Sequence, residues 1–283
     1  MTYADLLLTA DFDRTLTAPD STVPERNCQA IRDFMAQGGA FTVNTGRSLP
    51  MYSAHRFSVP VDAPLLLYNG SAAVDRDTGE VLRCRRFRLE RRAVVEELLE
   101  RYPDLTVEVQ GLKAHYLFRR NAMWEKFCET NGCAWAYARP EDDLGPFLKA
   151  TLYQEFQAPT VADLFRATPE QLARMDQVEA ELRSAFGDEA SVFRAAPRII
   201  DVHAGQVSKA RAARELQEEL GRRLLICVGD GENDIPMMEA ADYAFCPADS
   251  VLADRFPTVC PCAEGAVADV IYEKIPGILA ENP

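Results

Sequence analysis

The chain has 283 residues and carries 44 acidic against 31 basic side chains, a formal net charge of −13. This charge argues against nucleic acid or an anionic membrane as a partner. No apolar run approaches the roughly 20 residues that span a bilayer, and the N-terminus lacks the charged start of a signal peptide. With 47% hydrophobic residues, we therefore expect a cytoplasmic globular protein of one large or two ordinary domains.

The first predicted element is a buried strand at Leu6–Ala10. It is followed directly by a segment with two acidic residues, Asp11 and Asp13. In open α/β sheets the reactive groups lie beyond the carboxyl ends of the strands. Residues i and i+2 of an extended chain point to the same side, so both carboxylates can face one reacting atom. One can attack while the other gives or takes a proton. The alternative interpretation is an Asp-rich loop that only caps the next helix.

Helices and strands then alternate, which predicts a parallel sheet with helices on both faces. After the strand at 40–44, Thr45, Gly46 and Arg47 supply a hydroxyl, a tight-turn glycine and a guanidinium, which suit a phosphate. The predicted elements up to residue 84 are a helix at 24–37, strands at 40–44 and 64–68, a helix at 49–57, and a hairpin of 72–75 with 80–84.

The pattern changes to an α+β block between residues 84 and 195, which predicts an inserted domain; the core domain is then 1–83 with 196–283. Six arginines lie at the start of the inserted block, and their side chains are expected to be exposed to solvent: 83, 85, 86, 88, 91 and 92. The stretch 197–202 is expected to return to the core. The predicted elements of the block are helices at 90–102, 122–131 and 169–186, and strands at 106–110, 114–119, 149–156 and 191–195.

A second acidic segment follows a buried strand at 222–228 and contains Asp230 and Asp234 among glycines. If this strand neighbours the first one, its carboxylates converge with Asp11 and Asp13. Carboxylates about 4 Å apart repel by about 4 kcal/mol per pair at an effective dielectric near 20, so the cluster needs a cation. An all-oxygen site suits Mg²⁺. Lys209 opens the predicted helix at 208–220, where its ammonium can also lie near a phosphate.

The eight cysteines are scattered and make no Cys-x-x-Cys pair, so we expect reduced, partly buried thiols and not a zinc or disulfide framework. The histidines, His55, His115 and His203, are dispersed along the chain. We expect them to form no ligand set.

Four segments in this order (11–17, 44–47, Lys209 and 229–237) resemble the haloacid dehalogenase superfamily, and within it the Cof-like type IIB phosphatases. The resemblance implies a Rossmann-like, doubly wound parallel sheet with an inserted α+β cap domain of type IIB. It makes Asp11 the nucleophile that becomes an aspartyl-phosphate, and Asp13 the general acid and base. The other implied roles are phosphoryl binding by Thr45, charge neutralisation by Lys209, a Mg²⁺ site of Asp11, Asp13, Asp230 and Asp234, and substrate binding by Thr45, Gly46, Arg47, Asn69 and Asn233.

The reaction implied is Mg²⁺-dependent hydrolysis of a small phosphorylated metabolite, with sugar phosphates as the leading class, by a monomer or homodimer. A phosphomutase with the same site is the alternative reaction. A response-regulator receiver is disfavoured, because receivers place these acids on different strands and are much shorter. A non-catalytic relative is disfavoured as well, because all four motifs keep their chemical groups. The chain departs from the family pattern at Arg14, which replaces a common glycine and is expected to point to solvent, and at Tyr68, which replaces a glutamate.

Overall fold

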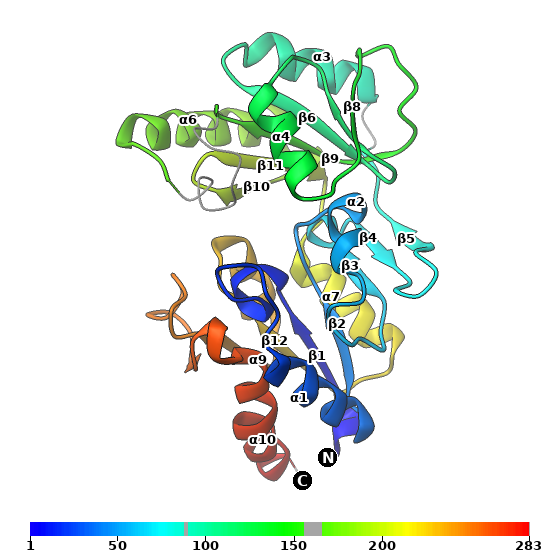
Figure 1. The fold of residues 1–283 in the computed structure, drawn as a ribbon, viewed down its shortest axis with the longest axis vertical. Coiled ribbons are helices and arrows are strands. Elements are labelled where there is room, and N and C mark those ends of the chain that lie inside the picture. Colours follow the sequence, from blue (N-terminus) through cyan, green and yellow to red (C-terminus); the bar gives the residue numbers. More distant parts are fainter. Residues whose placement is uncertain (88–89, 156–165, 283) are drawn as a thin grey trace. The chain divides into compact units, whose positions relative to one another are not determined.

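The computed structural model describes residues 1–87, 90–155 and 166–282, which form two compact units (Figure 1). The first unit consists of Met1–Gly46, His55–Arg83 and Ser208–Pro283, and the second of Arg47–Ala54 and Cys84–Val207. Within the described ranges, no helix combines the length and the apolar character that crossing a bilayer requires.

The centre of the first unit is a five-stranded parallel sheet in the order β14-β13-β12-β1-β2. Ala10, the last residue of β1, lies opposite Val228 of β12 on one side and Val43 of β2 on the other. The strands that precede the two acidic segments are therefore neighbours, as predicted. The bounds are β1 Leu6–Ala10, β2 Ala40–Val43, β12 Leu224–Val228, β13 Tyr243–Pro247 and β14 Thr258–Val259.

Both faces of this sheet are buried, because every residue of β1 and β2 is buried. Leu7, Leu225 and Cys227 pack on one face against side chains of α7 and α8. Helix α1 contacts β2 and α9. The helices of this unit are α1 Glu25–Ala36, α7 Lys209–Glu219, α8 Ile235–Ala240, α9 Ala266–Asp269 and α10 Ile275–Glu281.

A small three-stranded sheet, in the order β3-β4-β5, completes the first unit. It contains the predicted hairpin, which turns where the Asp75 N–H donates to the Glu80 carbonyl at 2.8 Å. Asn44, just after β2, forms an isolated parallel bridge with Leu66 of β3. The strands are β3 Leu65–Leu67, β4 Ala72–Val74 and β5 Val81–Cys84.

The second unit is built on a six-stranded sheet in the order β10-β11-β9-β6-β7-β8, antiparallel except for the β7–β8 pair. Its strands are β6 Thr106–Gly111, β7 His115–Leu117, β8 Trp135–Tyr137, β9 Phe147–Tyr153, β10 Ala190–Ala196 and β11 Ile199–Ala204. Its helices are α2 Leu49–Tyr52, α3 Arg91–Arg101, α4 Ala122–Thr130 and α6 Pro169–Phe186.

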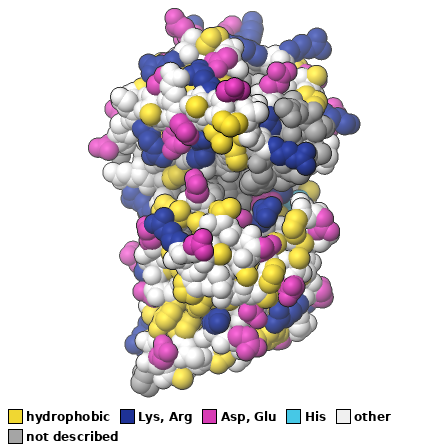
Figure 2. Space-filling view, turned by 90° about the vertical axis from the view of Figure 1, so that its left-hand side faces the viewer, with side chains coloured by type: hydrophobic (Ala, Val, Ile, Leu, Met, Phe, Trp, Pro, Cys, Tyr) yellow, Lys and Arg dark blue, Asp and Glu magenta, His cyan; other side chains and the backbone are white. Residues whose placement is uncertain are grey.

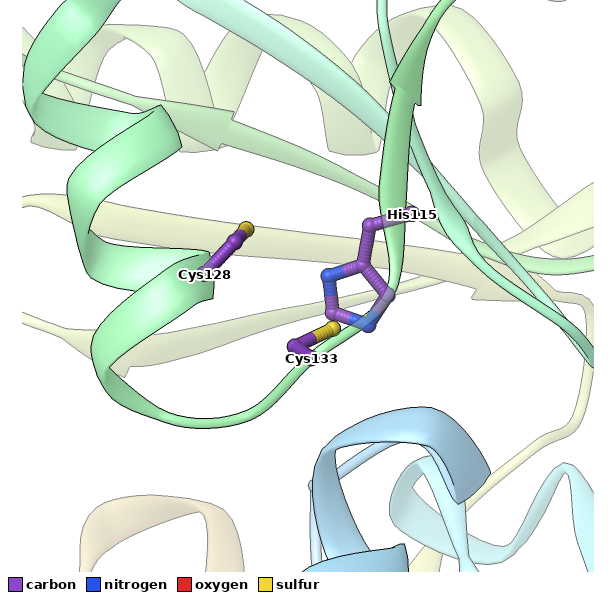
Figure 3. Close-up of side chains that lie close together, drawn as sticks. All are labelled: His115, Cys128 and Cys133. Carbon is purple, nitrogen blue, oxygen red and sulfur yellow. The ribbon is translucent and has the colours of Figure 1, made fainter.

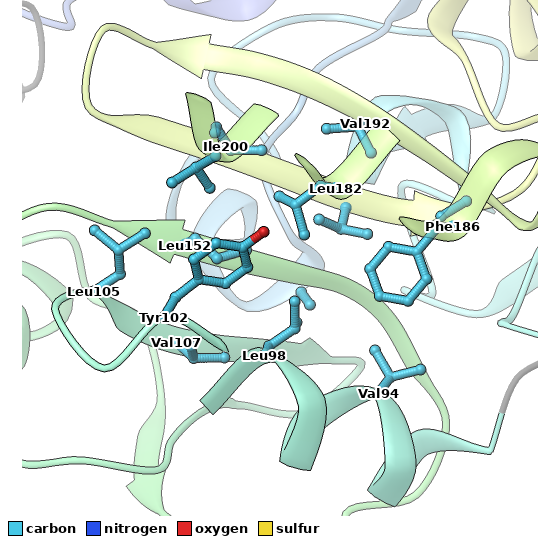
Figure 4. Close-up of a cluster of buried hydrophobic side chains, with 14 of the residues drawn as sticks. Val94, Leu98, Tyr102, Leu105, Val107, Leu152, Leu182, Phe186, Val192 and Ile200 are labelled. Carbon is cyan, nitrogen blue, oxygen red and sulfur yellow. The ribbon is translucent and has the colours of Figure 1, made fainter. Parts of the chain in front are cut away.

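One face of this second sheet is apolar and carries the core of the unit (Figure 4). Leu98 of α3 and Leu182 of α6 pack there with Leu152 and Ile200 from the strands. Helix α6 has the bounds that the sequence predicted. Its start is fixed by Pro169 in the first turn and by a capping box, in which Thr168 and Gln171 bind each other's backbone N–H.

The opposite face of the same strands carries buried polar side chains. Lys149 Nζ lies 3.0 Å from Asp201 Oδ2, and Thr151 Oγ1 donates to Asp201 Oδ1 at 2.8 Å. Tyr153 OH donates to Glu108 Oε2 at 2.6 Å. Because strand residues alternate between faces, the sequence places these groups at every second position of β6, β9 and β11.

Three expectations for the inserted block differ from the structure. Strand β11 belongs to the six-stranded sheet, between β10 and β9, so the second unit continues to Val207 and not to residue 195. Strand β8 was not predicted at all. The strand expected at 149–156 is β9, which spans Phe147–Tyr153; Phe156 lies outside the described residues.

The surface carries both signs of charge. Figure 2 shows Lys and Arg intermixed with Asp and Glu on the face in view, so the negative net charge forms no single patch there. In the arginine cluster, Arg83 pairs with Glu215 and Glu219, and Arg92 pairs with Glu96 at 2.7 Å. The Arg92 pair is exposed and fits the predicted solvated surface, whereas Arg83 is only partly exposed. Arg88 lies outside the described residues.

Candidate active site

Three carboxylates from the two acidic segments meet at the carboxyl edge of the parallel sheet. Asp11 directly follows β1 and donates its N–H to the Val228 carbonyl at 2.9 Å, which ties it to the end of β12. Asp230 and Asp234 come from the segment after β12. Each of the three residues offers a carboxylate oxygen, and these oxygens all lie within 4.8 Å of one another. Folding thus brings together residues that are more than 200 positions apart.

Lys209, the first residue of α7, places a buried ammonium beside two of these carboxylates. Its Nζ lies 2.6 Å from Asp11 Oδ1 and 2.6 Å from Asp234 Oδ1, and the side chain is buried. Ser208 caps the helix by accepting the Arg211 N–H, and Asn44 Nδ2 donates to the Lys209 carbonyl at 3.0 Å. These two contacts fix the start of α7 and therefore the direction of the ammonium.

Backbone N–H groups orient Asp234. Its Oδ2 accepts from the Asp230 N–H at 3.0 Å and from the Gly231 N–H at 3.1 Å. A Cβ added to Gly229 would lie 2.6 Å from the Asp234 Cβ. Only glycine leaves room at position 229 for this carboxylate, which explains the glycine before the acidic residues.

Asp230 is held by contacts that the sequence did not reveal. Thr15 Oγ1 donates to Asp230 Oδ1 at 3.1 Å, and Ser250 Oγ donates to the Asp230 carbonyl at 2.9 Å. Thr15 lies within the first motif, but nothing in the sequence pairs it with position 230. Ser250 lies in a loop whose neighbours could not be predicted.

Arg14 is partly exposed, as expected, but it does not only face solvent. Its Nε lies 3.9 Å from Asp230 Oδ2, with 40% of the side chain exposed. Its backbone has a φ of 59°. This is the left-handed region that glycine adopts freely, so an arginine at this position carries a backbone cost of about 1 kcal/mol.

Electrostatics in the cluster follow from burial and like charges. Burial raises the pKa of Asp11 to about 7; Lys209 opposes this shift, and Asp234 and Asp13 add to it. Burial also raises the pKa of Asp230 well above its ordinary value, and Asp11 and Asp234 reinforce the effect. Burial acts to lower the pKa of Lys209, but Asp11 and Asp234 outweigh it and the pKa is raised. The cluster holds more negative charge than one ammonium balances.

The three carboxylates fit a hard divalent cation. Their donor atoms are all oxygens, they are close enough to share one ion, and the excess negative charge favours one. The Asp13 side chain is not part of this group of three. Asp13 is partly exposed and has extended backbone angles, φ −73° and ψ 126°. Its place among the metal ligands stays a prediction.

The other predicted substrate residues fall into two groups. Thr45, Gly46 and Asn69 lie together: the Asn69 N–H donates to the Thr45 carbonyl at 3.0 Å, and a Cβ on Gly46 would lie 2.9 Å from Asn69 Oδ1. Asn233 lies beside Gly231 in the acidic loop. Arg47 is grouped with the second unit, and its contact with a substrate stays a prediction.

The backbone that presents Asn69 is unusual. Tyr68, Asn69 and Gly70 all have positive φ values, of 53°, 54° and 91°. A Cβ on Gly70 would lie 2.6 Å from the Ser208 carbonyl oxygen, so this turn packs directly on the start of α7. Three consecutive left-handed residues are a strained arrangement of a kind that clusters at functional sites.

One group of side chains in the second unit was not expected from the sequence. His115 is not isolated: it lies in the second unit with Cys128 and Cys133, and the potential donor atoms of the three residues are within 4.8 Å of one another. The residues are separated in sequence by a strand, a helix and a tight turn. No spacing motif reveals them, because β7 and the end of α4 meet only in the folded unit.

Comparisons with known proteins identify the family of this chain. The family model for haloacid dehalogenase-like hydrolases matches residues 8–251. A curated protein of Buchnera aphidicola subsp. Schizaphis graminum, named "Putative phosphatase", is 21% identical over 257 residues, which are 89% of this chain and 88% of that protein.

Solved structures share the whole fold. A haloacid dehalogenase-like hydrolase from B. subtilis aligns with a TM-score of 0.76 at 17% identity, over 95% of this chain and 99% of its own. A sugar phosphatase of subclass IIB aligns with a TM-score of 0.74 at 18% identity, over 96% of this chain and 99% of its own. The predicted fold class, a parallel α/β core with an inserted cap, is thereby confirmed.

Proposed function

Because the chain belongs to the haloacid dehalogenase-like hydrolase family, we propose that it is a Mg²⁺-dependent phosphatase of small phosphorylated metabolites, sugar phosphates first among them. The observation that carries the proposal is the convergence of Asp11, Asp230 and Asp234 around the Lys209 ammonium at the sheet edge. The likeness to a subclass IIB sugar phosphatase supports the substrate class.

Asp11 is the nucleophile of the proposed reaction. Its carboxylate oxygen forms a bond to the phosphorus while the bond from phosphorus to the substrate oxygen breaks, which leaves an aspartyl-phosphate on Asp11. The contact at 2.6 Å from Lys209 Nζ to Asp11 Oδ1 favours the ionised carboxylate and places a positive charge beside the incoming phosphate.

Asp13 moves the protons of both half-reactions. In the first it donates a proton to the departing substrate oxygen. In the second it takes a proton from the water that attacks the phosphorus and regenerates the Asp11 carboxylate with release of inorganic phosphate. Its position two residues after Asp11 on extended backbone is compatible with both steps.

Asp11, Asp230 and Asp234 are the residues that would hold the divalent ion, with Asp13 as a further predicted ligand. When bound, the ion supplies positive charge that lets a dianionic phosphate approach a carboxylate. Thr45, Asn69 and Asn233 are the residues proposed to bind phosphoryl or substrate oxygens.

The test is release of inorganic phosphate from p-nitrophenyl phosphate and from a panel of sugar phosphates, with Mg²⁺ and with a chelator. The wild type should hydrolyse at least one sugar phosphate only with the metal. Asp11→Asn should lose at least about 10³-fold in kcat, because the amide cannot form the intermediate. Asp254→Asn, which changes an exposed aspartate of the same unit, should retain wild-type activity.

Three results would contradict the proposal. Robust turnover by Asp11→Asn would reject the nucleophile. Conversion of a sugar phosphate into its isomer, without free phosphate, would favour the phosphomutase alternative. Activity without Mg²⁺ in chelator would remove the metal from the mechanism.

A further inference from the structure

A second group of potential metal ligands lies in the second unit, apart from the acidic cluster. It consists of His115 at the start of β7, Cys128 in the last turn of α4 and Cys133 just beyond that helix. All three side chains are buried, and one potential donor atom from each lies within 4.8 Å of the other two. Figure 3 shows both thiols pointing toward the imidazole.

The end of α4 explains why the two thiols meet. The Cys133 N–H donates to the Cys128 carbonyl at 2.8 Å, the Gly132 N–H donates to the Glu129 carbonyl at 3.1 Å, and Gly132 has a φ of 64°. These are the bonds of a Schellman motif, in which the side chains at the Cys128 and Cys133 positions come into contact. The thiol pair alone therefore has a packing explanation.

Packing does not require the imidazole. The His115 N–H donates to the Ala134 carbonyl at 2.9 Å, which brings β7 against the segment that follows Cys133. An aliphatic side chain would fill this buried position without the cost of burying a polar ring. The histidine is the feature that points to a ligand.

The polar partners of His115 hold its ring in a fixed orientation. Nδ1 pairs with Glu108 Oε1, and Nε2 is hydrogen-bonded to Ser48 Oγ at 2.5 Å. Glu108 is itself held by Tyr153 OH at 2.6 Å and Gln110 Nε2 at 3.1 Å. Both ring nitrogens thus have partners, and a metal ion on Nε2 would have to replace Ser48 there. The Glu108 carboxylate would then remain on Nδ1, a recurrent arrangement that fixes the ring of a metal-binding histidine and raises its basicity.

We propose that His115, Cys128 and Cys133 bind one Zn²⁺ ion in the second unit. Two thiolates and an imidazole are a donor set that zinc prefers, and four residues between the cysteines is a spacing found in zinc sites. The two thiolates would balance the charge of the ion.

Metal binding requires the imidazole to exchange one present partner for the ion and the ligand atoms to move closer together. Ligand atoms around a tetrahedral zinc ion lie about 3.3–3.8 Å apart, given bonds of about 2.0–2.3 Å, so pairs at most 4.8 Å apart have to close by at most about 1.5 Å. Rotation of the two cysteine side chains can supply this. No other His, Cys, Asp or Glu of the described ranges belongs to the group, and a water would take the fourth position of a tetrahedral site.

Zinc binding would join β7, the end of α4 and the turn before β8, and it releases protons from the ligands. The ion would thus hold together the edge of the six-stranded sheet. This role is independent of the proposed phosphatase reaction, so the failure of either proposal leaves the other intact.

The experiment measures the metal in the full-length protein after removal of any purification tag and without chelators. The wild type should hold about one zinc per chain, and Cys128→Ser or Cys133→Ser less than about 0.2. Cys28→Ser, which changes a buried cysteine of the first unit, should keep the full amount.

Cobalt distinguishes this site from the acidic cluster. One equivalent of Co²⁺ added to metal-free wild type should produce thiolate-to-cobalt charge-transfer absorption, which carboxylates cannot give. The band should disappear in Cys133→Ser and persist in Asp230→Asn. A mercurial that blocks thiols should release the zinc from wild-type protein, which tests the ligands even if the variants fail to fold.

Three outcomes would overturn the proposal. The first is metal-free wild type that shows no thiolate-to-cobalt band. The second is a zinc content that is unchanged by the cysteine substitutions or by the mercurial. The third is a Cys128–Cys133 disulfide, detected by mass spectrometry of the protein purified without reductant.

Discussion

Lys209 Nζ lies 2.6 Å from Asp11 Oδ1, although the two residues are 198 positions apart in the sequence. The same nitrogen lies 2.6 Å from Asp234 Oδ1. One buried ammonium thus links the ends of β1 and β12 with the start of α7, and its removal should affect both stability and activity.

Lys209→Met should destabilise the protein by about 3–5 kcal/mol at neutral pH in chelator, because it leaves buried carboxylates without their counter-charge. Urea unfolding measures this change. Lys126→Met, at a lysine whose side chain is 62% exposed, should change stability by less than about 0.5 kcal/mol. Equal effects of the two substitutions would show that the buried contact adds nothing. Phosphatase activity should be lost in Lys209→Met and retained in Lys126→Met.

Gly229→Ala should disturb Asp234. The added Cβ would lie 2.6 Å from the Asp234 Cβ, so we expect a loss of about 1–3 kcal/mol of stability and a higher Mg²⁺ requirement for phosphate release. Gly277→Ala is the matched control, since nothing lies within 4 Å of its added Cβ in α10. It should stabilise the protein by about 0.5–1 kcal/mol. A Gly229→Ala enzyme with unchanged stability and metal dependence would contradict the proposed crowding.

Asp230→Asn should have opposite effects with and without metal. The raised pKa of Asp230, which comes from burial and from Asp11 and Asp234, shows that its negative charge is unfavourable in the metal-free protein. The amide should therefore stabilise the protein in chelator by about 1–3 kcal/mol at pH 7.5. The further increase in stability that Mg²⁺ gives the wild type should shrink in the variant, because a ligand charge is lost. Thermal unfolding with and without Mg²⁺ measures both. A variant that gains as much from Mg²⁺ as the wild type would remove Asp230 from the metal site.

His203 should make folding sensitive to acid. Burial lowers its pKa from 6.5 to about 3; Asp201 opposes the shift and Lys149 adds to it. Between these values the unfolded chain binds a proton that the folded chain does not. The contribution of the buried neutral His203 to the free energy of unfolding is therefore present above about pH 6.5. It is lost as the pH falls, by up to about 1.4 kcal/mol per pH unit.

The measurement is the free energy of unfolding of wild type and His203→Gln at several pH values from about 4.5 to 7. The glutamine does not titrate, so the difference in stability between the two proteins should shrink as the pH falls. Parallel curves would show that another group causes the acid sensitivity.

Local patterns were enough for elements whose limits are set by neighbouring residues. Helix α6 begins and ends where it was predicted, because Thr168, Pro169 and Gln171 fix its start through their own backbone contacts. Strand β11 shows the opposite case. The sequence identified an apolar run at 197–202, but an apolar run pairs equally well with either sheet. Only the pairing with β9 and β10 assigns it to the second unit.

The candidate site divides in the same way. The acidic segments could be predicted to meet, because parallel strands bring their carboxyl ends to one edge of a sheet. The contacts of Thr15 and Ser250 with Asp230 could not, since they depend on side chains from separate loops.

The sequence by itself determined the α/β core, the inserted unit and the convergence of Asp11 with Asp230 and Asp234. The spacing of hydrophobic residues and the ends of strands can be recognised from short stretches of consecutive residues. Only the tertiary structure decided that Lys209 bridges two of these carboxylates and that His115 meets Cys128 and Cys133. Such meetings depend on which elements pack together. That choice is made by the summed burial of many distant side chains and not by any local pattern.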